Sequence, residues 1–163
     1  MVDKQSTLWR YLSGPQKDLI QQGFYLLEDT GTHTPIHPVS DYSYLVFPFA
    51  KAYEGFLKQL FLDLQLIKKW QYENDHFRIG KILSPEMAKT LRRNSIYTQL
   101  TNRLGSSEIP DELWNTWKQG RNLIFHYFPH NIKAITLPQA EELIEEFIRV
   151  MQLAVDVCHA VEA

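Results

Sequence analysis

The hydrophobic residues of this chain recur at three- and four-residue spacing in several long stretches, the pattern of α-helices that bury one face. No segment alternates apolar and polar residues for long enough to indicate a half-buried β-strand. We therefore predict an all-α fold, an up-and-down bundle of four to six helices in which residues 1–163 form a single domain.

The first two helical regions enclose a loop. The first runs over about residues 6–27 with a break near the Ser-Gly-Pro sequence at 13–15, and residues 29–38 are rich in helix breakers. The second begins at Ser40 or Asp41, since such side chains cap helix N-termini, and continues to about residue 69. Pro48 is expected to kink it or to mark its start. Its spacing predicts a central core helix with a buried stripe of Phe49, Tyr53, Phe56, Leu57, Leu60, Leu64 and Ile67.

Three more helices follow. The helical pattern is lost over residues 70–83, and Ser84 followed by Pro85 then begins a middle helix that Gly105 closes after residue 104. Pro110 opens a fourth helix, which is expected to stop at Pro129. A last helix covers about residues 138–161, and its predicted core stripe is Leu143, Phe147, Met151, Ala154 and Cys158.

The composition is that of a globular protein from a reducing compartment. Hydrophobic residues make up 44% of the chain and charged residues 22%, which excludes general disorder. Cys158 is the single cysteine, so neither an intramolecular disulfide nor a cysteine-based zinc cluster can form. The N-terminal residues lack the apolar core of a signal peptide, and no apolar run is long enough to span a bilayer. We expect a soluble cytoplasmic protein without membrane contact.

A net charge of −2 argues against a protein that coats nucleic acids, because such binding needs many Lys and Arg side chains to neutralise phosphates. Any contact with nucleic acid must therefore be local. Basic side chains do cluster along part of the chain, where they fit either solvated helix faces or such a local contact. They are Lys68, Lys69, Arg78, Lys81, Arg92, Arg93, Arg103 and Lys118.

The histidines do not predict a metal site. His33 and His37 are four residues apart but lie in a proline-containing loop without a third ligand. Pro129 separates His126 from His130, so this pair lacks helical spacing. No zinc or other metal is expected.

The fourth helix departs from the usual division into apolar and charged faces. At about 100° per residue, one arc holds Leu113, Trp114, Trp117, Gly120, Ile124, Phe125 and Phe128. Arg121 falls inside this arc and needs a counter-charge, an edge of the core or a partner surface. The opposite side carries neutral polar groups, Asn115, Gln119, Asn122 and His126. Arg121 and His126 lie about 140° apart on this wheel, so they converge only around a ligand or across an interface.

Two segments resemble the HEPN superfamily. The sequence RNLIFH at 121–126 resembles its signature, an Arg, a polar residue that is often Asn, and a His after four intervening residues. The sequence AYEGFLK at 52–58 resembles the glutamate-bearing helix of the HEPN domain in the RnlA and LsoA toxins. The resemblance covers about residues 41–163 and leaves the first forty unplaced. Some members carry a modifiable Tyr two residues after the His, whereas this chain has Phe128 there, next to Tyr127.

The resemblance implies a HEPN-like bundle and a metal-independent endoribonuclease without a cofactor, acting as a toxin in a toxin–antitoxin or phage-defence system. A ribose 2′-hydroxyl would attack the adjacent phosphate and leave a cyclic phosphate and a 5′-hydroxyl. His126 would serve as general acid or base and Arg121 would stabilise the phosphorane. Asn122 would orient the phosphate or the imidazole.

The role of Glu54 has two interpretations. The resemblance implies a catalytic residue, either the partner of Arg121 or a second acid or base. On its own helical wheel, however, Glu54 lies with Lys51, Lys58 and Gln65, where a solvated ion pair at four-residue spacing is equally reasonable. In the catalytic interpretation Lys51 and Lys58 take part in substrate binding.

The partners implied are an RNA substrate, a second copy of the chain and a cognate antitoxin or inhibitor protein. Members of the superfamily generally form homodimers in which two Arg-to-His helices face a shared groove, and aromatic side chains mixed with Arg suit such an interface. The alternative is a non-catalytic helical module, a degenerate HEPN domain or an adaptor, that docks a protein partner through its aromatic helix.

Overall fold

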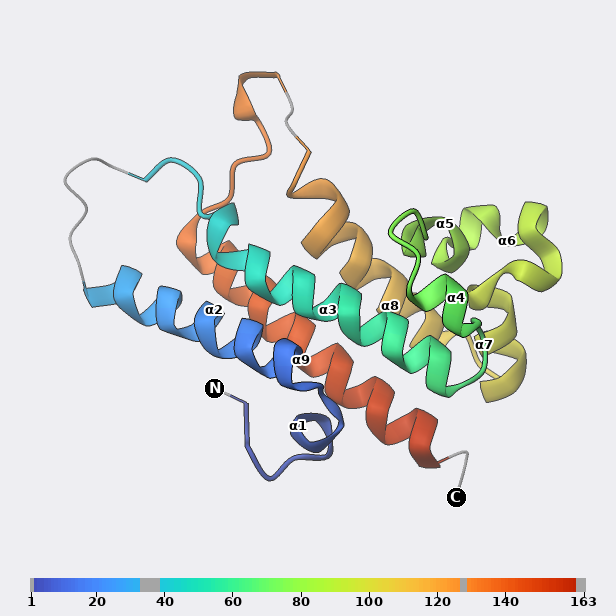
Figure 1. The fold of residues 1–163 in the computed structure, drawn as a ribbon. Helices are drawn as coiled ribbons and strands as arrows, with labels where there is room; N and C mark the ends of the chain where they lie inside the picture. The colour runs from blue at the N-terminus through green and yellow to red at the C-terminus, as the bar shows by residue number, and fades with distance from the viewer. Residues whose placement is uncertain (1, 33–38, 127–128, 161–163) are drawn as a thin grey trace.

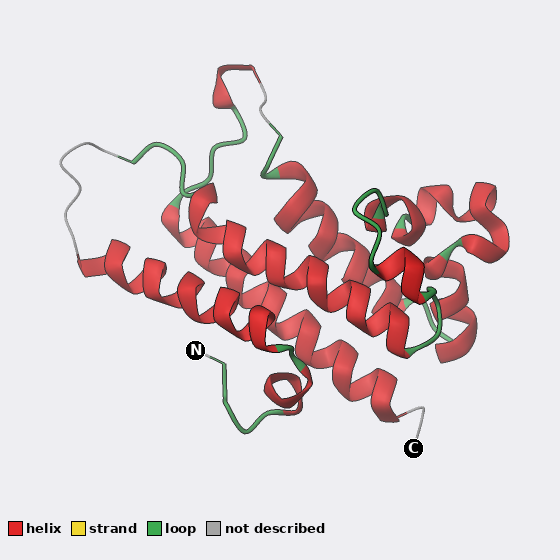
Figure 2. Cartoon of the chain, in the orientation of Figure 1, coloured by secondary structure: helices red, strands yellow, loops and turns green. Residues whose placement is uncertain are grey.

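The computed structural model of the chain describes residues 2–32, 39–126 and 129–160, and every regular element in these ranges is helical (Figure 2). The predicted all-α fold is confirmed. The four longest helices pack as a bundle, and the shorter helices α4 to α7 gather at one end of it (Figure 1). The bundle consists of α2 (Gly14–Thr32), α3 (Ser43–Asp63), α8 (Glu108–Trp117) and α9 (Leu137–Ala160).

The first helical region is interrupted where the sequence predicts. Helix α1 (Thr7–Tyr11) begins after Ser6, whose hydroxyl accepts the backbone N–H of Trp9 at 3.0 Å. Helix α2 continues to Thr32, further than the breaker-rich sequence suggests. The remainder of the predicted loop, with His33 and His37, lies outside the described residues.

Helix α3 is the central core helix. Every residue of its predicted stripe is at most 5% exposed, which confirms the pattern. Tyr53 reaches both neighbouring helices, because its hydroxyl donates to the carbonyl of Leu113 in α8 at 2.9 Å and its ring lies 5.0 Å from that of Phe147 in α9. Burial raises the pKa of Tyr53 well above its ordinary value and keeps the hydroxyl a neutral donor.

The bounds of α3 differ from the prediction at both ends. Asp41 precedes the helix, and its carboxylate accepts the backbone N–H of Ser43 at 3.0 Å and the amide of Asn131 at 3.1 Å. Burial alone would raise the pKa of Asp41, but these hydrogen bonds lower it overall and keep the carboxylate charged. Pro48 lies inside the helix instead of at its start. The helix ends at Asp63, because Gln65 adopts a left-handed φ of 57°.

Residues 69–104 form several short helices instead of the single middle helix predicted over 84–104. That prediction is wrong because Arg92 adopts a φ of 48° and Ser95 caps a new helix by accepting the N–H of Thr98 at 3.2 Å. Gly105, at a φ of 69°, ends this stretch as predicted. The helices are α4 (Lys69–Tyr72), α5 (Ile79–Leu83), α6 (Pro85–Leu91), η1 (Arg92–Asn94) and α7 (Ile96–Leu104).

Helix α9 contributes the last layer of the core. Phe147, Met151, Ala154 and Cys158 are at most 2% exposed and Leu143 packs at their margin, so the predicted stripe is confirmed. Arg149 joins α9 to α8, since its guanidinium contacts both Glu112 and Glu146. The Arg149 hydrogen bond lowers the pKa of Glu146. Among the helices of the described residues, none has the length and apolar character needed to cross a membrane.

Candidate functional site

The backbone changes its winding after Trp117. Helix α8 is followed by a π-helix, η2 (Lys118–Leu123), and His126 lies in a bend beyond it. The fourth helix therefore begins slightly earlier than predicted, at Glu108, and ends well before Pro129. A π-helix bonds residues five apart and holds more residues per turn than an α-helix. The helical wheel drawn from the sequence assumes α winding, so it gives wrong side-chain directions beyond Trp117.

Gly120 brings this π-helix against α9. A Cβ atom at Gly120 would lie 2.4 Å from Cζ of Phe147, closer than any side chain allows. The backbone of η2 therefore rests on the Phe147 ring, and Gly120 itself is buried. This contact fixes the inner side of η2, while Arg121 and Asn122 are partly exposed beside it.

Arg121 lies at the rim of the core. Its guanidinium carbon is 5.2 Å from the centre of the Trp117 ring, and its Nη2 is 3.6 Å from Oε2 of Glu54 on α3. The side chains of Arg121 and Glu54 are 40% and 33% exposed, so the pair is not an internal one. At this separation and exposure it contributes at most about 1 kcal/mol to stability. Its main effect is to fix the guanidinium between the ring and the carboxylate.

His126 is held by Asn122. Its Nε2 lies 3.1 Å from Oδ1 of Asn122. An amide oxygen only accepts hydrogen bonds, so Nε2 is the donor in this contact. The imidazole is exposed, whereas Asn122 lines the same cavity as Arg121. Asn122 and His126 are four residues apart, so the side chain of Asn122 connects the imidazole to the lining of the cavity.

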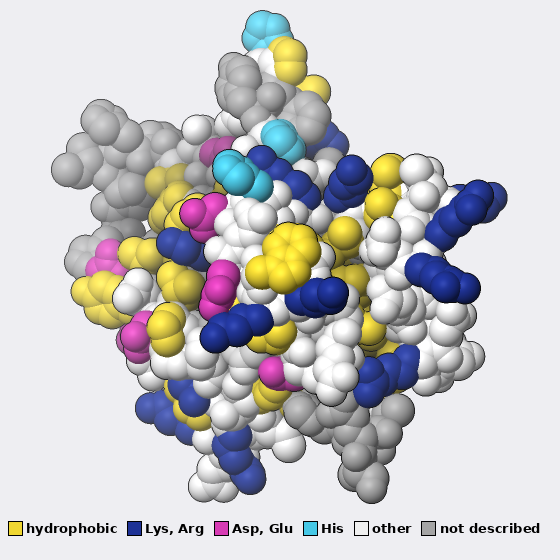
Figure 3. Space-filling model, turned by 45° about the vertical axis from the view of Figure 1, so that its right-hand side comes forward, with side chains coloured by type: hydrophobic (Ala, Val, Ile, Leu, Met, Phe, Trp, Pro, Cys, Tyr) yellow, Lys and Arg dark blue, Asp and Glu magenta, His cyan; other side chains and the backbone are white. Residues whose placement is uncertain are grey.

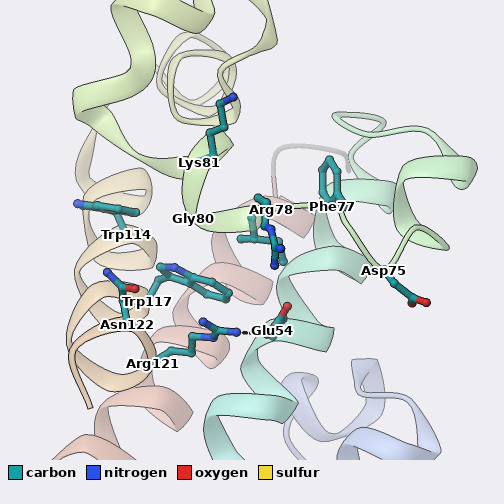
Figure 4. A pocket seen from close by; sticks show the side chains of 11 residues that line it. Glu54, Asp75, Phe77, Arg78, Gly80, Lys81, Trp114, Trp117, Arg121 and Asn122 are labelled. Atoms are coloured by element: carbon teal, nitrogen blue, oxygen red, sulfur yellow. Dashed lines mark ion pairs between the residues drawn. The ribbon is translucent and has the colours of Figure 1, made fainter. Parts of the chain in front are cut away.

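A cavity of about 280 Å³ opens beside Arg121, between α3, α5 and the α8–η2 segment (Figure 4). We refer to it as the tryptophan cavity, because Trp114 and Trp117 form one wall. Figure 4 shows the Arg78 side chain pointing toward Trp117 and Glu54. The lining of the tryptophan cavity contains three cationic side chains and two carboxylates. The residues are Glu54, Asp75, Phe77, Arg78, Ile79, Gly80, Lys81, Trp114, Trp117, Arg121 and Asn122.

A second cavity, of about 450 Å³, also borders the ion pair. It is lined by Phe47, Ala50, Lys51, Glu54, Arg121 and Phe125. Glu54 and Arg121 line both cavities, so the two cavities adjoin at this ion pair. Phe47 and Phe125 meet edge to face, with ring centres 5.7 Å apart, and they are 53% and 39% exposed. An exposed aromatic pair therefore lines the second cavity.

The predicted site residues are distributed unevenly over this arrangement. Arg121, Glu54 and Asn122 line the tryptophan cavity and Lys51 lines the second cavity, whereas the described lining of both lacks His126. Lys58 lies further along α3, outside the described lining of both. Tyr127 and Phe128 are outside the described residues.

Sequence reasoning missed the contribution to the site of α5 and the residues that lead into it. Phe77, Arg78 and Gly80 line the cavity, although the helical pattern is lost over this stretch. A Cβ atom at Gly80 would lie 2.7 Å from Nε1 of Trp117, so glycine lets the backbone approach the indole. The cluster of Arg78 and Lys81 in an otherwise acidic chain was the available signal.

Comparisons of the chain with protein-family models, curated proteins and solved structures found no match. The HEPN resemblance therefore depends on the segments at 52–58 and 121–126 alone. Among the residues that the structure describes, no group of three or more His, Cys, Asp and Glu side chains is arranged to hold a metal ion.

Proposed function

We propose that this protein is an endoribonuclease of the HEPN type that cleaves RNA without a metal ion. The observation that carries the proposal is the contact between Arg121 and Glu54, 3.6 Å apart, which joins the two segments that separately resemble the HEPN superfamily. Both residues line the tryptophan cavity, as does Asn122, whose amide oxygen contacts His126. Arg121 thus supplies a permanent cation to the cavity lining, and Asn122 connects the imidazole of His126 to the same lining.

The reaction follows from the chemistry of these groups. The 2′-hydroxyl oxygen bonds to phosphorus, its proton passes to a base, and the bond from phosphorus to the 5′-oxygen breaks as that oxygen gains a proton. Nδ1 of His126 is the position that accepts or donates a proton, because Nε2 is engaged with Asn122. The guanidinium of Arg121 stabilises the charge that develops on the phosphorane oxygens. Glu54 holds that guanidinium in place.

The site supports a homodimer as its working form. The exposed Phe47 and Phe125 pair borders the second cavity, and Arg121 lines the same cavity. Aromatic side chains beside an arginine are the composition of interface centres. Pairing two copies through this aromatic pair would bring two Arg121 side chains toward one shared groove.

We further propose a role as a toxin or antiviral effector that a cognate inhibitor protein holds in check, in line with the resemblance. The alternative function is a non-catalytic helical module that binds a protein partner. The specific observation in its favour is the exposure of the large apolar side chains Tyr44, Phe47, Phe125 and Ile132.

The test compares RNA cleavage by the wild type, His126→Ala and His130→Ala in the presence of EDTA. The wild type should produce 2′,3′-cyclic phosphate and 5′-hydroxyl ends. His126→Ala should lower the rate by about 10²- to 10⁴-fold, whereas His130, an exposed histidine of η3 (Pro129–Asn131), should be replaceable without effect. The same pattern should appear in growth inhibition.

Two outcomes would contradict the proposal. Cleavage that His126→Ala leaves undiminished would exclude this site, and cleavage that EDTA abolishes would exclude the metal-independent reaction. A protein that leaves RNA intact but captures a protein partner through Phe47 would establish the binding module instead.

A further inference from the structure

Charge is distributed unevenly along the chain. Residues 76–107 contain six Lys and Arg residues and one acidic residue, Glu86, whereas the remainder contains eleven basic and eighteen acidic residues. This basic segment forms the helices from α5 to α7. In Figure 3, dark-blue Lys and Arg side chains occupy the right-hand part of the surface with few carboxylates among them. The net charge of −2 therefore conceals a strongly basic region.

The basic segment begins at the tryptophan cavity. Arg78 and Lys81 line that cavity, and Gly80 between them sits against the indole of Trp117. Helix α6 follows α5 directly and packs on it. Three further exposed cations, Lys89, Arg92 and Arg93, belong to α6 and η1. Cationic side chains thus continue from the interior of the cavity onto the neighbouring surface.

We infer that the tryptophan cavity and the α5–α6 surface form one binding path for single-stranded RNA. An unpaired base enters the cavity and stacks on Trp114, and the adjoining phosphates contact Arg78 and Lys81 before the strand continues over α6. Aromatic side chains interleaved with cations are the features that bind single strands. This inference rests on the proposed function for the identity of the substrate.

The geometry favours a strand over a duplex and over a free nucleotide. A cavity of about 280 Å³ has room for one base, and an unpaired base can enter it directly, whereas a base of a duplex must first be unpaired and unstacked. A free nucleotide would need only the cations within the cavity. Lys89, Arg92 and Arg93 lie outside its described lining and are explained by a longer polyanion.

The test measures binding apart from cleavage. A fluorescent 2′-O-methyl RNA strand of about ten nucleotides lacks the attacking hydroxyl, so its fluorescence anisotropy reports affinity alone. The wild type should bind this strand at least about tenfold more tightly than the duplex formed with its complement. Trp114→Ala should weaken binding of the strand by about 5- to 100-fold, and Trp114→Phe should retain most of the affinity because a stacking surface remains.

The proposed phosphate contacts are tested with two double variants that remove the same charge from different places. Arg78→Ala combined with Lys81→Ala should lower the slope of log affinity against log salt by about 1.4, the value for two phosphate contacts on a single strand. Lys4→Ala combined with Lys17→Ala removes the same charge near α1 and α2 and should leave the slope unchanged. An equal decrease of this slope in the two double variants would overturn the inference. Equal affinity for strand and duplex would overturn it as well.

Failure of this inference is distinguishable from failure of the proposed function. Cleavage that depends on His126, together with binding that is indifferent to Trp114 and Arg78, would refute the path while leaving the ribonuclease intact. Strand-selective binding that depends on Trp114 and Arg78, without any cleavage, would support the binding path and refute the ribonuclease. Urea midpoints within the wild-type range would exclude misfolding as the cause of weakened binding.

Discussion

The guanidinium of Arg121 lies between the face of Trp117 and the carboxylate of Glu54. On an α-helical wheel this arginine falls among apolar residues, where an unpaired charge is costly. The structure resolves the conflict by leaving its side chain 40% exposed, with its planar head on the ring. The charge is therefore available to an anionic ligand, and Glu54 acts on its position more than on the stability of the fold.

Glu54→Gln separates a positioning role from an acid–base role. If Glu54 positions Arg121, the substitution should lower kcat for RNA cleavage by about 10- to 100-fold, because small displacements of a catalytic group are costly. KM should not rise, since a negative charge near the phosphate is removed. Steady-state kinetics across the pH range provide the measurement.

The control is Glu73→Gln, which removes the same charge from an exposed pair with Lys69, 3.8 Å away, and should leave both constants unchanged. Loss of one limb of the pH–rate profile in Glu54→Gln would show instead that Glu54 transfers a proton.

The π-helix η2 depends on a glycine at one position. Gly120 lies against the ring of Phe147, and a Cβ atom there would meet Cζ at 2.4 Å. The same glycine lies inside the apolar arc drawn from the sequence, so its inward orientation was predictable. The change from α to π winding was not, because a hydrophobic wheel presumes a constant angle per residue.

Gly120→Ala should destabilise the protein by about 1–3 kcal/mol, the range for an overpacked core. Urea unfolding monitored by circular dichroism measures the change. Gly31→Ala is the matched control, because nothing lies within 4 Å of a Cβ atom there and α2 is helical at this position. It should stabilise by up to about 1 kcal/mol. Equal midpoints for the two variants would show that η2 adapts to the added methyl group.

The arrangement of the molecule was predictable where helices are long. The stripes of α3 and α9 predicted their buried faces, because three- and four-residue spacing persists over many turns there. Helices as short as α4 and α5 leave no such period, so the wall containing Phe77 and Arg78 was not foreseen. The contact of Glu54 with Arg121 joins α3 to η2 across the fold, and spacing within one segment does not encode it.

A homodimer formed through the aromatic pair should dissociate in Phe47→Asp. Phe47 is 53% exposed, so the substitution leaves the core intact, while a carboxylate at an interface centre should weaken association by about 30-fold or more. Sedimentation velocity at micromolar concentration measures the distribution of species. Trp70→Asp, at a residue of α4 that is 62% exposed, should leave it unchanged. A wild type that sediments as a monomer would contradict the dimer.

The π-turn between Trp117 and Arg121 makes the number of residues there as important as their identity. Regular α winding over 118–123 with no residue removed would rotate each later side chain by about 100° relative to Trp117, because the π-helix holds about one residue more over the same rotation. In such a regular helix Arg121 would turn away from Glu54 and Asn122 would turn away from the cavity, although both residues were still present. Register, like chemistry, is therefore a property that variants of this protein must preserve.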